Sequence, residues 1–129
     1  MKNFSVVIIA KNEEENIVNC ISSLLKFSND ILVIDSGSTD KTIALAKNIG
    51  AKVISVTWQG FGATRNMGAT YTQFDWILAI DADETVSDKL IAAIKNIDEL
   101  NEQIVYGFKR QNYLNGKRIL FGEWGKDKV

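Results

Sequence analysis

The chain has 129 residues, of which 46% are hydrophobic and 9% aromatic, and this length and composition suit one domain spanning residues 1–129. Its net charge of −1 argues against nucleic-acid binding, and its single cysteine, Cys20, excludes an internal disulfide and favours a cytoplasmic protein. No run approaches the roughly 18 apolar residues of a membrane span, and no secretion signal is visible, so we expect any membrane contact to be peripheral.

The first half of the chain alternates β-branched runs with helical patterns. Residues 4–10 predict a continuous apolar strand, and Asn12 with Glu15 three residues later predicts a capped helix start. That helix is expected to run to about residue 25. Residues 31–34 predict a second strand, followed by a turn-rich loop in which Ser38 is expected to cap a helix through residue 47. A third strand is predicted over residues 52–56.

The second half continues the alternation and ends differently. Residues 64–69 predict a short helix, residues 76–80 a fourth strand ending in Asp81, and Ser87 the cap of a helix to about residue 97. Runs at residues 105–113 and 117–121 flank Asn115-Gly116, a strong hairpin signal. The order predicts an α/β fold with a mostly parallel central sheet, flanking helices and a C-terminal β-hairpin.

The charge is uneven, because residues 1–104 carry −5 and residues 105–129 carry +4. The basic C-terminal stretch could face phosphates or anionic lipid, or it could form a solvated hairpin surface. Both interpretations stay open at this stage.

An acidic pair follows the fourth predicted strand. Asp81 and Asp83 are separated by one residue, so a turn can bring both carboxylates to a hard divalent cation, Mg²⁺ or Mn²⁺, that also holds phosphate oxygens. A DxD pair alone is a weak signal, since acidic turns that merely end a strand are common.

Two other readings of these segments are disfavoured. The segment also looks like the nucleophile motif of haloacid-dehalogenase-type phosphatases, but that motif lies near the N-terminus and needs a long downstream stretch, whereas 46 residues follow Asp83. Dinucleotide binding is disfavoured because the glycine-containing segment at residues 60–65 lacks the third glycine and does not open the first βα turn.

Four segments, taken in order, resemble the inverting family 2 glycosyltransferases, which have the GT-A fold. They are VVIIAKNE at residues 6–13, IDSGSTDKT at 34–42, WQGFGATRN at 58–66 and DADE at 81–84. The third segment makes the chain look closest to the lipopolysaccharide-core β-glucosyltransferase-like subgroup. The resemblance runs from residue 4 to the end and implies a metal-dependent hexosyltransferase that inverts the sugar.

The resemblance also implies partners and a location. The donor is expected to be a nucleotide-diphospho-sugar such as a UDP-hexose, and the acceptor a glycan or glycolipid of cell-envelope polysaccharide or lipopolysaccharide synthesis. The reaction is expected in the cytoplasm, at the inner face of the bacterial cell membrane. The resembled proteins continue past the position of Val129, so the chain is expected to be a catalytic domain lacking the acceptor-side region.

Roles for individual residues follow from the matched motifs. Uracil and ribose contacts fall on residues 10–13 and Asp35, phosphate contact on Arg65, and metal binding on the acidic pair. The nucleotide-sugar set is Ala10, Lys11, Asn12, Glu13, Asp35, Arg65, Asp81 and Ala82; the metal set is Asp81 and Asp83. Ser36 departs from the second aspartate common in the family. Simpler roles are a loop-capping acid for Asp35 and a surface ion pair for Arg65.

The catalytic base is assigned to Asp127, which follows Trp124 as in the family's tryptophan-then-aspartate segment. Its alternative role is that of an exposed acid between two lysines. A non-catalytic nucleotide-sugar-binding module is the competing function, since it would keep Asp35 and Asp83 but need no base. A sugar nucleotidyltransferase is less favoured because its Gly- and Arg-rich first loop is missing.

Overall fold

A computed structural model of the chain describes residues 3–96, 112–114 and 117–119. The chain divides into two compact units, one ending at Asn96 and one beginning at Ile97, and each is described by itself. The expectation of a single domain over residues 1–129 stays a prediction.

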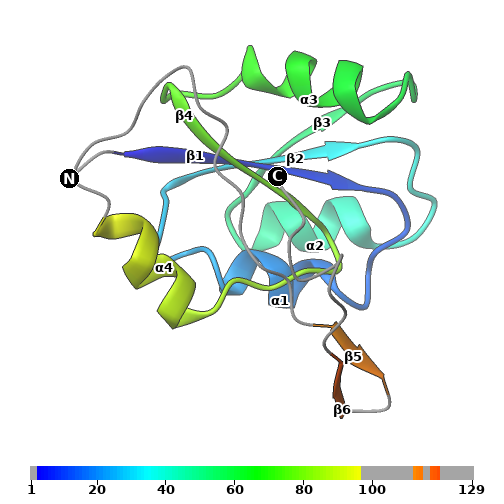
Figure 1. The fold of residues 1–129 in the computed structure, drawn as a ribbon. Coiled ribbons are helices and arrows are strands. Elements are labelled where there is room, and N and C mark those ends of the chain that lie inside the picture. Colours follow the sequence, from blue (N-terminus) through cyan, green and yellow to red (C-terminus); the bar gives the residue numbers. More distant parts are fainter. Residues whose placement is uncertain (1–2, 97–111, 115–116, 120–129) are drawn as a thin grey trace. The chain divides into compact units, whose positions relative to one another are not determined.

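The first unit is built on a parallel sheet of four strands in the order β3-β2-β1-β4 (Figure 1). The strands are β1 (Phe4–Ala10), β2 (Asp30–Asp35), β3 (Lys52–Ser55) and β4 (Trp76–Asp81). From β1 the chain moves outward to β3 and then crosses back to place β4 on the other side of β1. The direction of winding therefore reverses between β1 and β4, where open α/β sheets bind their ligands.

Helices cover both faces of this sheet. α1 (Ile17–Ser22) and α2 (Thr42–Asn48) lie on one face, α3 (Phe61–Ala69) lies on the other, and α4 (Asp88–Lys95) follows β4 (Figure 1). Strands buried on both faces have continuous apolar sequences, and in β1 and β2 the polar residues Ser5, Asp30 and Asp35 lie only near the strand ends. The predicted α/β architecture with a mostly parallel sheet and flanking helices is confirmed.

The contact of α3 with the sheet depends on Gly68. A Cβ atom at this position would lie 2.3 Å from Cδ1 of Ile34 and 3.1 Å from Cγ1 of Val7, both of which belong to the buried core. Because glycine has no Cβ, the helix backbone can approach the two central strands closely.

The prediction that a helix begins at Asn12 is wrong, because α1 begins at Ile17. Asn12 adopts a left-handed backbone with φ of 52°. Its side-chain oxygen accepts the N–H of Thr39 at 2.8 Å, and its own N–H donates to Oγ of Ser38 at 2.8 Å. These long-range bonds hold the backbone outside the helical region, so the local capping pattern is overridden.

The prediction that Ser38 caps the second helix is also wrong. Its hydroxyl donates to the carboxylate of Asp35 and accepts the N–H of Asn12. α2 begins instead at Thr42, whose N–H and hydroxyl are bound by Oδ1 of Asp40 at 2.9 and 2.5 Å.

Other boundaries agree more closely with expectation. The Ser87 side chain accepts the N–H of Leu90 at 3.1 Å and caps α4, as predicted. In the second unit, β5 (Asn112–Leu114) pairs antiparallel with β6 (Lys117–Ile119), and the Leu114–Lys117 partners leave a two-residue connection at the predicted place. The remainder of the predicted hairpin strands lies outside the described residues.

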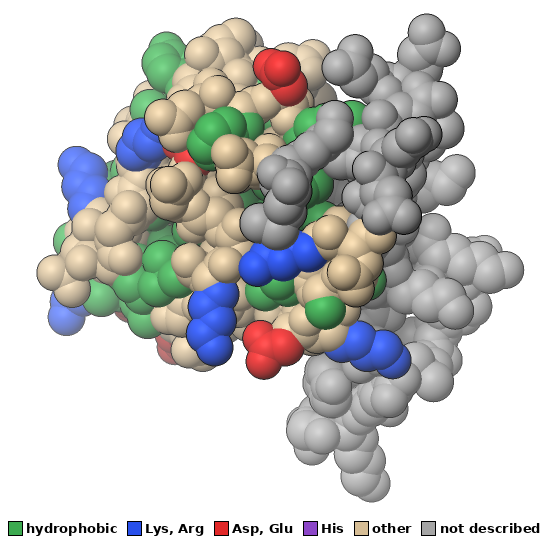
Figure 2. All heavy atoms as spheres, turned by 90° about the vertical axis from the view of Figure 1, so that its left-hand side faces the viewer, with side chains coloured by type: hydrophobic (Ala, Val, Ile, Leu, Met, Phe, Trp, Pro, Cys, Tyr) green, Lys and Arg blue, Asp and Glu red, His purple; other side chains and the backbone are tan. Residues whose placement is uncertain are grey.

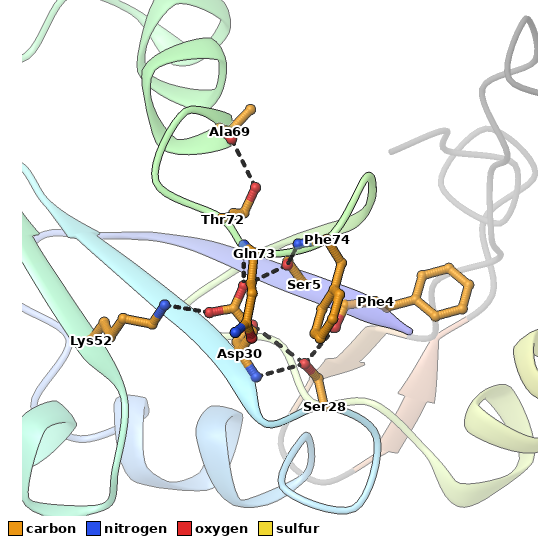
Figure 3. Close-up of polar contacts among 9 residues, drawn as sticks. All are labelled: Phe4, Ser5, Ser28, Asp30, Lys52, Ala69, Thr72, Gln73 and Phe74. Atoms are coloured by element: carbon orange, nitrogen blue, oxygen red, sulfur yellow. Dashed lines mark hydrogen bonds and ion pairs between the residues drawn. The ribbon is translucent and has the colours of Figure 1, made fainter. Parts of the chain in front are cut away.

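The edge of the sheet where the strands begin is held by the carboxylate of Asp30. This carboxylate accepts hydrogen bonds from the hydroxyl of Ser5 at 2.5 Å and from the N–H of Gln73 at 2.7 Å. It also forms an ion pair with Lys52, whose Nζ lies 2.5 Å away (Figure 3). Burial alone would raise the pKa of Asp30, but these bonds outweigh it and hold the pKa below its ordinary value. One buried side chain therefore connects β2 to β1, to β3 and to the segment that enters β4.

Figure 2 faces the side on which β1 begins. The described Lys and Arg side chains and the Asp and Glu side chains are interspersed over it, and neither sign of charge forms a continuous patch. Within the described ranges, no helix has the length and apolar character needed to cross a membrane.

Candidate functional site

Three loops leave the sheet at the edge where the parallel strands end. Ala10 is paired with Asp35 and Ile9 with Asp81, so β1, β2 and β4 end at nearly the same level. Because these strands are parallel, the loops that follow them lie at one edge of the sheet. Ala10, Asp35 and Asp81, which lie far apart in sequence, are thereby brought to neighbouring strand ends.

The loops after β1 and β2 are joined by direct hydrogen bonds. Besides the Asn12 contacts, the N–H of Glu13 donates to Oγ1 of Thr42 at 2.8 Å, and the N–H of Glu14 donates to Oδ2 of Asp40 at 3.2 Å. The Glu14 carboxylate in turn accepts the N–H of Lys41 at 3.1 Å. Because backbone groups of each loop are satisfied by side chains of the other, the two loops form one structural unit.

Asp35 lies at the centre of the second loop. It is 1% exposed, and its carboxylate accepts the N–H groups of Gly37 and Ser38 at 3.1 and 2.8 Å as well as the Ser38 hydroxyl. These contacts are those of a loop-capping acid. The contact of Asp35 with base or ribose stays a prediction, as do those of Ala10, which is buried, and of Lys11, Asn12 and Glu13, which are exposed or partly exposed.

The acidic pair occupies a tight turn at the end of β4. The N–H of Glu84 donates to the carbonyl of Asp81 at 3.0 Å, and the N–H of Asp81 donates to Oε1 of Glu84 at 2.8 Å. Ala82 is buried between the two aspartates, whereas Asp83 is exposed. The turn is therefore anchored through Ala82 and presents the carboxylate of Asp83 to solvent.

Arg65 of α3 approaches this turn from a different segment of the chain. Its Nη2 lies 3.6 Å from Oδ1 of Asp81, and both side chains are 37% exposed. Two residues assigned to the nucleotide site from separate motifs are thus neighbours in space. An ion pair this exposed contributes little stability, about 0–1 kcal/mol, so an incoming anion or cation can replace either partner.

The acidic groups around the turn share a negative field. The thiol of Cys20 is buried behind it and donates to the carbonyl of Asp81 at 3.7 Å. Burial, followed by the charges of Glu84, Asp83, Asp81 and Glu13, raises the pKa of Cys20 to about 12. Burial is the larger cause and opposes a charge of either sign at Cys20, and the four carboxylates add a smaller effect that reflects the negative charge of the turn.

Residues 5–124 match the model of Glycosyl transferase family 2. The chain belongs to this family. An uncharacterized glycosyltransferase of Rickettsia bellii is 39% identical over 111 residues, which cover 86% of this chain and 34% of that protein. The lipopolysaccharide core biosynthesis glycosyltransferase LpsC of Rhizobium meliloti is 31% identical over 118 residues, covering 87% of this chain and 43% of LpsC.

The fold of this family 2 chain is similar to that of a protein whose structure has been solved. Glucosyl-3-phosphoglycerate synthase from Mycobacterium tuberculosis, in complex with Mn²⁺, UDP and glucosyl-3-phosphoglycerate, matches with a TM-score of 0.57 and 30% identity. The match covers 65% of this chain and 36% of that one. The sheet and helices of the first unit therefore have the GT-A fold expected from the sequence. The chain spans about a third of the length of these two proteins, the Rickettsia relative and the synthase.

The assignment of Asp81 and Asp83 to a metal ion stays a prediction. Among the described residues, no three His, Cys, Asp or Glu side chains are grouped so that they could hold an ion. Asp127, the expected base, lies outside the described residues. Sequence reasoning did not assign a role to Phe61, whose ring lies against Arg65; the four-residue spacing of the two on one helix was the available signal.

Proposed function

We propose that this family 2 domain binds a UDP-hexose with a divalent metal and transfers the hexose, with inversion, to a glycan or lipid-linked acceptor. The observation that carries the proposal is the approach of Arg65 to the Asp81–Asp83 turn at the point where the sheet reverses its winding. A cationic fork and a pair of carboxylates at one place suit a metal-bound diphosphate.

The residues of the turn fit Mg²⁺ or Mn²⁺. Both ions prefer oxygen ligands and are usually bound by one or two carboxylates together with substrate phosphates, and Asp81 and Asp83 supply that number. The solvent-facing position of Asp83 leaves room for phosphate and water oxygens. When bound, the metal would neutralise charge on the departing diphosphate. The Mn²⁺ and UDP present together in the Mycobacterium tuberculosis synthase support this assignment.

Donor binding assigns separate tasks to the chain's own residues. Arg65 would leave Asp81 and pair with phosphate oxygens, for which a guanidinium has matching geometry. The joined first and second loops, from Ala10 to Glu13 and around Asp35, would bind uracil and ribose. Asp35 is 1% exposed, so its own loop would have to open before the carboxylate could accept a base N–H or a ribose hydroxyl.

Acceptor chemistry is assigned to Asp127. The acceptor hydroxyl must lose a proton as its oxygen attacks the anomeric carbon from the face opposite the diphosphate, and a carboxylate can take that proton. We place the reaction in cell-envelope or lipopolysaccharide synthesis, as in the β-glucosyltransferase-like subgroup, at the inner face of the membrane. The name of LpsC supports this pathway, and the +4 charge of residues 105–129 would favour peripheral contact with anionic lipid.

The test is calorimetry of UDP binding in Mn²⁺ and in chelator. We expect the wild-type chain to bind UDP at least tenfold more tightly with Mn²⁺, and Asp83→Asn to reduce this difference by about 10-fold or more, the usual effect of disturbing a metal site. Asp75→Asn is the matched control, because Asp75 is also exposed but precedes β4 at the opposite edge of the sheet. Equal wild-type affinities in Mn²⁺ and chelator would contradict the metal assignment.

A further inference from the structure

An exposed aromatic pair lies beside the cationic side chain of the site. Cζ of Arg65 is 5.7 Å from the centroid of the Phe61 ring, within the range of a cation–π contact. The ring of Trp58 meets that of Phe61 edge-on, with centroids 4.8 Å apart and an interplanar angle of 86°. Trp58, Phe61 and Arg65 therefore form a continuous row that ends at Asp81.

Burial accounts for only part of the position of these rings. Phe61 is 57% and Trp58 45% exposed, whereas Thr64 and Gly68, on the adjoining stripe of α3, are buried. About half of each ring therefore stays in contact with water. What Phe61 does provide is a ring under the guanidinium one helical turn further along the chain.

A restrained guanidinium binds an anion with a smaller loss of freedom. An arginine side chain carries about 2 kcal/mol of rotamer entropy, part of which is lost whenever a ligand immobilises it. Here Arg65 is held between an aromatic ring and a carboxylate before any ligand arrives. The cation–π contact does not use the N–H groups, so it can persist when Arg65 exchanges the Asp81 carboxylate for phosphate.

We propose that Phe61, supported by Trp58, is a positioning residue that holds the guanidinium of Arg65 for the diphosphate of the donor. This inference rests on the proposed function, in which Arg65 contacts the donor phosphates. The ring acts only through Arg65 and does not touch the reacting atoms. Its contribution is therefore confined to ligands that carry phosphate groups.

The test compares UDP with uridine, which shares the base and ribose but has no phosphate. Calorimetry on the whole chain should show that Phe61→Leu, which removes the ring and keeps apolar bulk, weakens UDP binding about two- to fivefold, the size of an exposed cation–π contact. Uridine affinity should stay at the wild-type level. Phe61→Tyr keeps the ring and should bind UDP as the wild type does.

Two further variants separate positioning from a general loss of structure. Tyr71→Leu is the matched control: Tyr71 is 55% exposed, follows the same helix, and should be replaceable without effect on UDP. In an Arg65→Gln background, Phe61→Leu should cause no additional loss, because the two residues act as one unit.

The inference is overturned if Phe61→Leu binds UDP like the wild type, if it weakens uridine equally, or if its effect persists in the Arg65→Gln background. Metal-independent UDP binding by the wild-type chain would instead count against the metal site of the proposed function. The effect of Phe61→Leu on UDP and uridine affinity could still be measured in that case.

Discussion

Adding one methyl group at Gly68 tests how α3 is held on the sheet. In Gly68→Ala the new Cβ would lie 2.3 Å from Cδ1 of Ile34 and 3.1 Å from Cγ1 of Val7. Ile34 is fully buried, so its terminal methyl can move only by changing rotamer within a packed core, and the β-branched Val7 is stiff.

The size of the effect follows from two opposing terms. Forcing an extra methyl group into a packed core costs about 1–3 kcal/mol. Alanine in place of glycine inside a helix returns about 0.5–1 kcal/mol. We therefore expect Gly68→Ala to lower the free energy of unfolding by up to about 2.5 kcal/mol, and to be about 1–3 kcal/mol less stable than a glycine-to-alanine change in this helix that causes no clash.

Gly62 provides the control within the same helix. A Cβ there meets no atom within 4 Å, so Gly62→Ala should keep the helical gain without the clash. Urea denaturation followed by circular dichroism would measure both variants, with the slope m unchanged if only stability differs. The reasoning is refuted if Gly68→Ala proves as stable as Gly62→Ala, since α3 would then not lie against Ile34 and Val7 as described.

Two further predictions concern carboxylates at other places in the chain. Because the folded-state pKa of Asp30 lies below its ordinary value of 3.8, its contribution to stability is present above that pH and is lost as pH falls through the folded pKa. Urea titrations at pH 5 and pH 3 should therefore show a smaller acid-induced loss in Asp30→Asn than in the wild type, and equal losses would contradict the assigned bonds. Asp127→Asn should cut hexose transfer from UDP-glucose to a lipopolysaccharide-core oligosaccharide about 100-fold or more, with UDP affinity unchanged. Transfer at the wild-type rate would return Asp127 to the role of a surface acid.

The strands and the acidic turn were readable from the sequence because their signals are local. An apolar run such as residues 4–10 can be buried only in a strand or a long helix, and Asp81 follows its strand directly. The first loop was misread because Asn12 is held by Ser38 and Thr39, about 26 residues away. Local capping rules take no account of such partners.

The approach of Arg65 to Asp81 could not be predicted from the spacing of these residues along the sequence either. It depends on how closely α3 lies on the sheet, and hence on the missing side chain of Gly68, whose neighbours come from β1 and β2. Family motifs assigned both charged residues to one ligand, but the mutual contact and the ring of Phe61 are products of tertiary packing.

The Asp30 carboxylate has a consequence for engineering this framework. It meets its partners on β1, β3 and the segment entering β4 only when every strand is in its native alignment, so a strand shifted by one residue loses a buried charged contact. The contacts of Asp30 thus stabilise the native register of the strands from the edge of the sheet opposite the Asp81 turn. Loops that follow β1, β2 and β4 can therefore be exchanged with those of relatives to test the proposed donor contacts, while Ser5, Asp30 and Lys52 are kept in the strands.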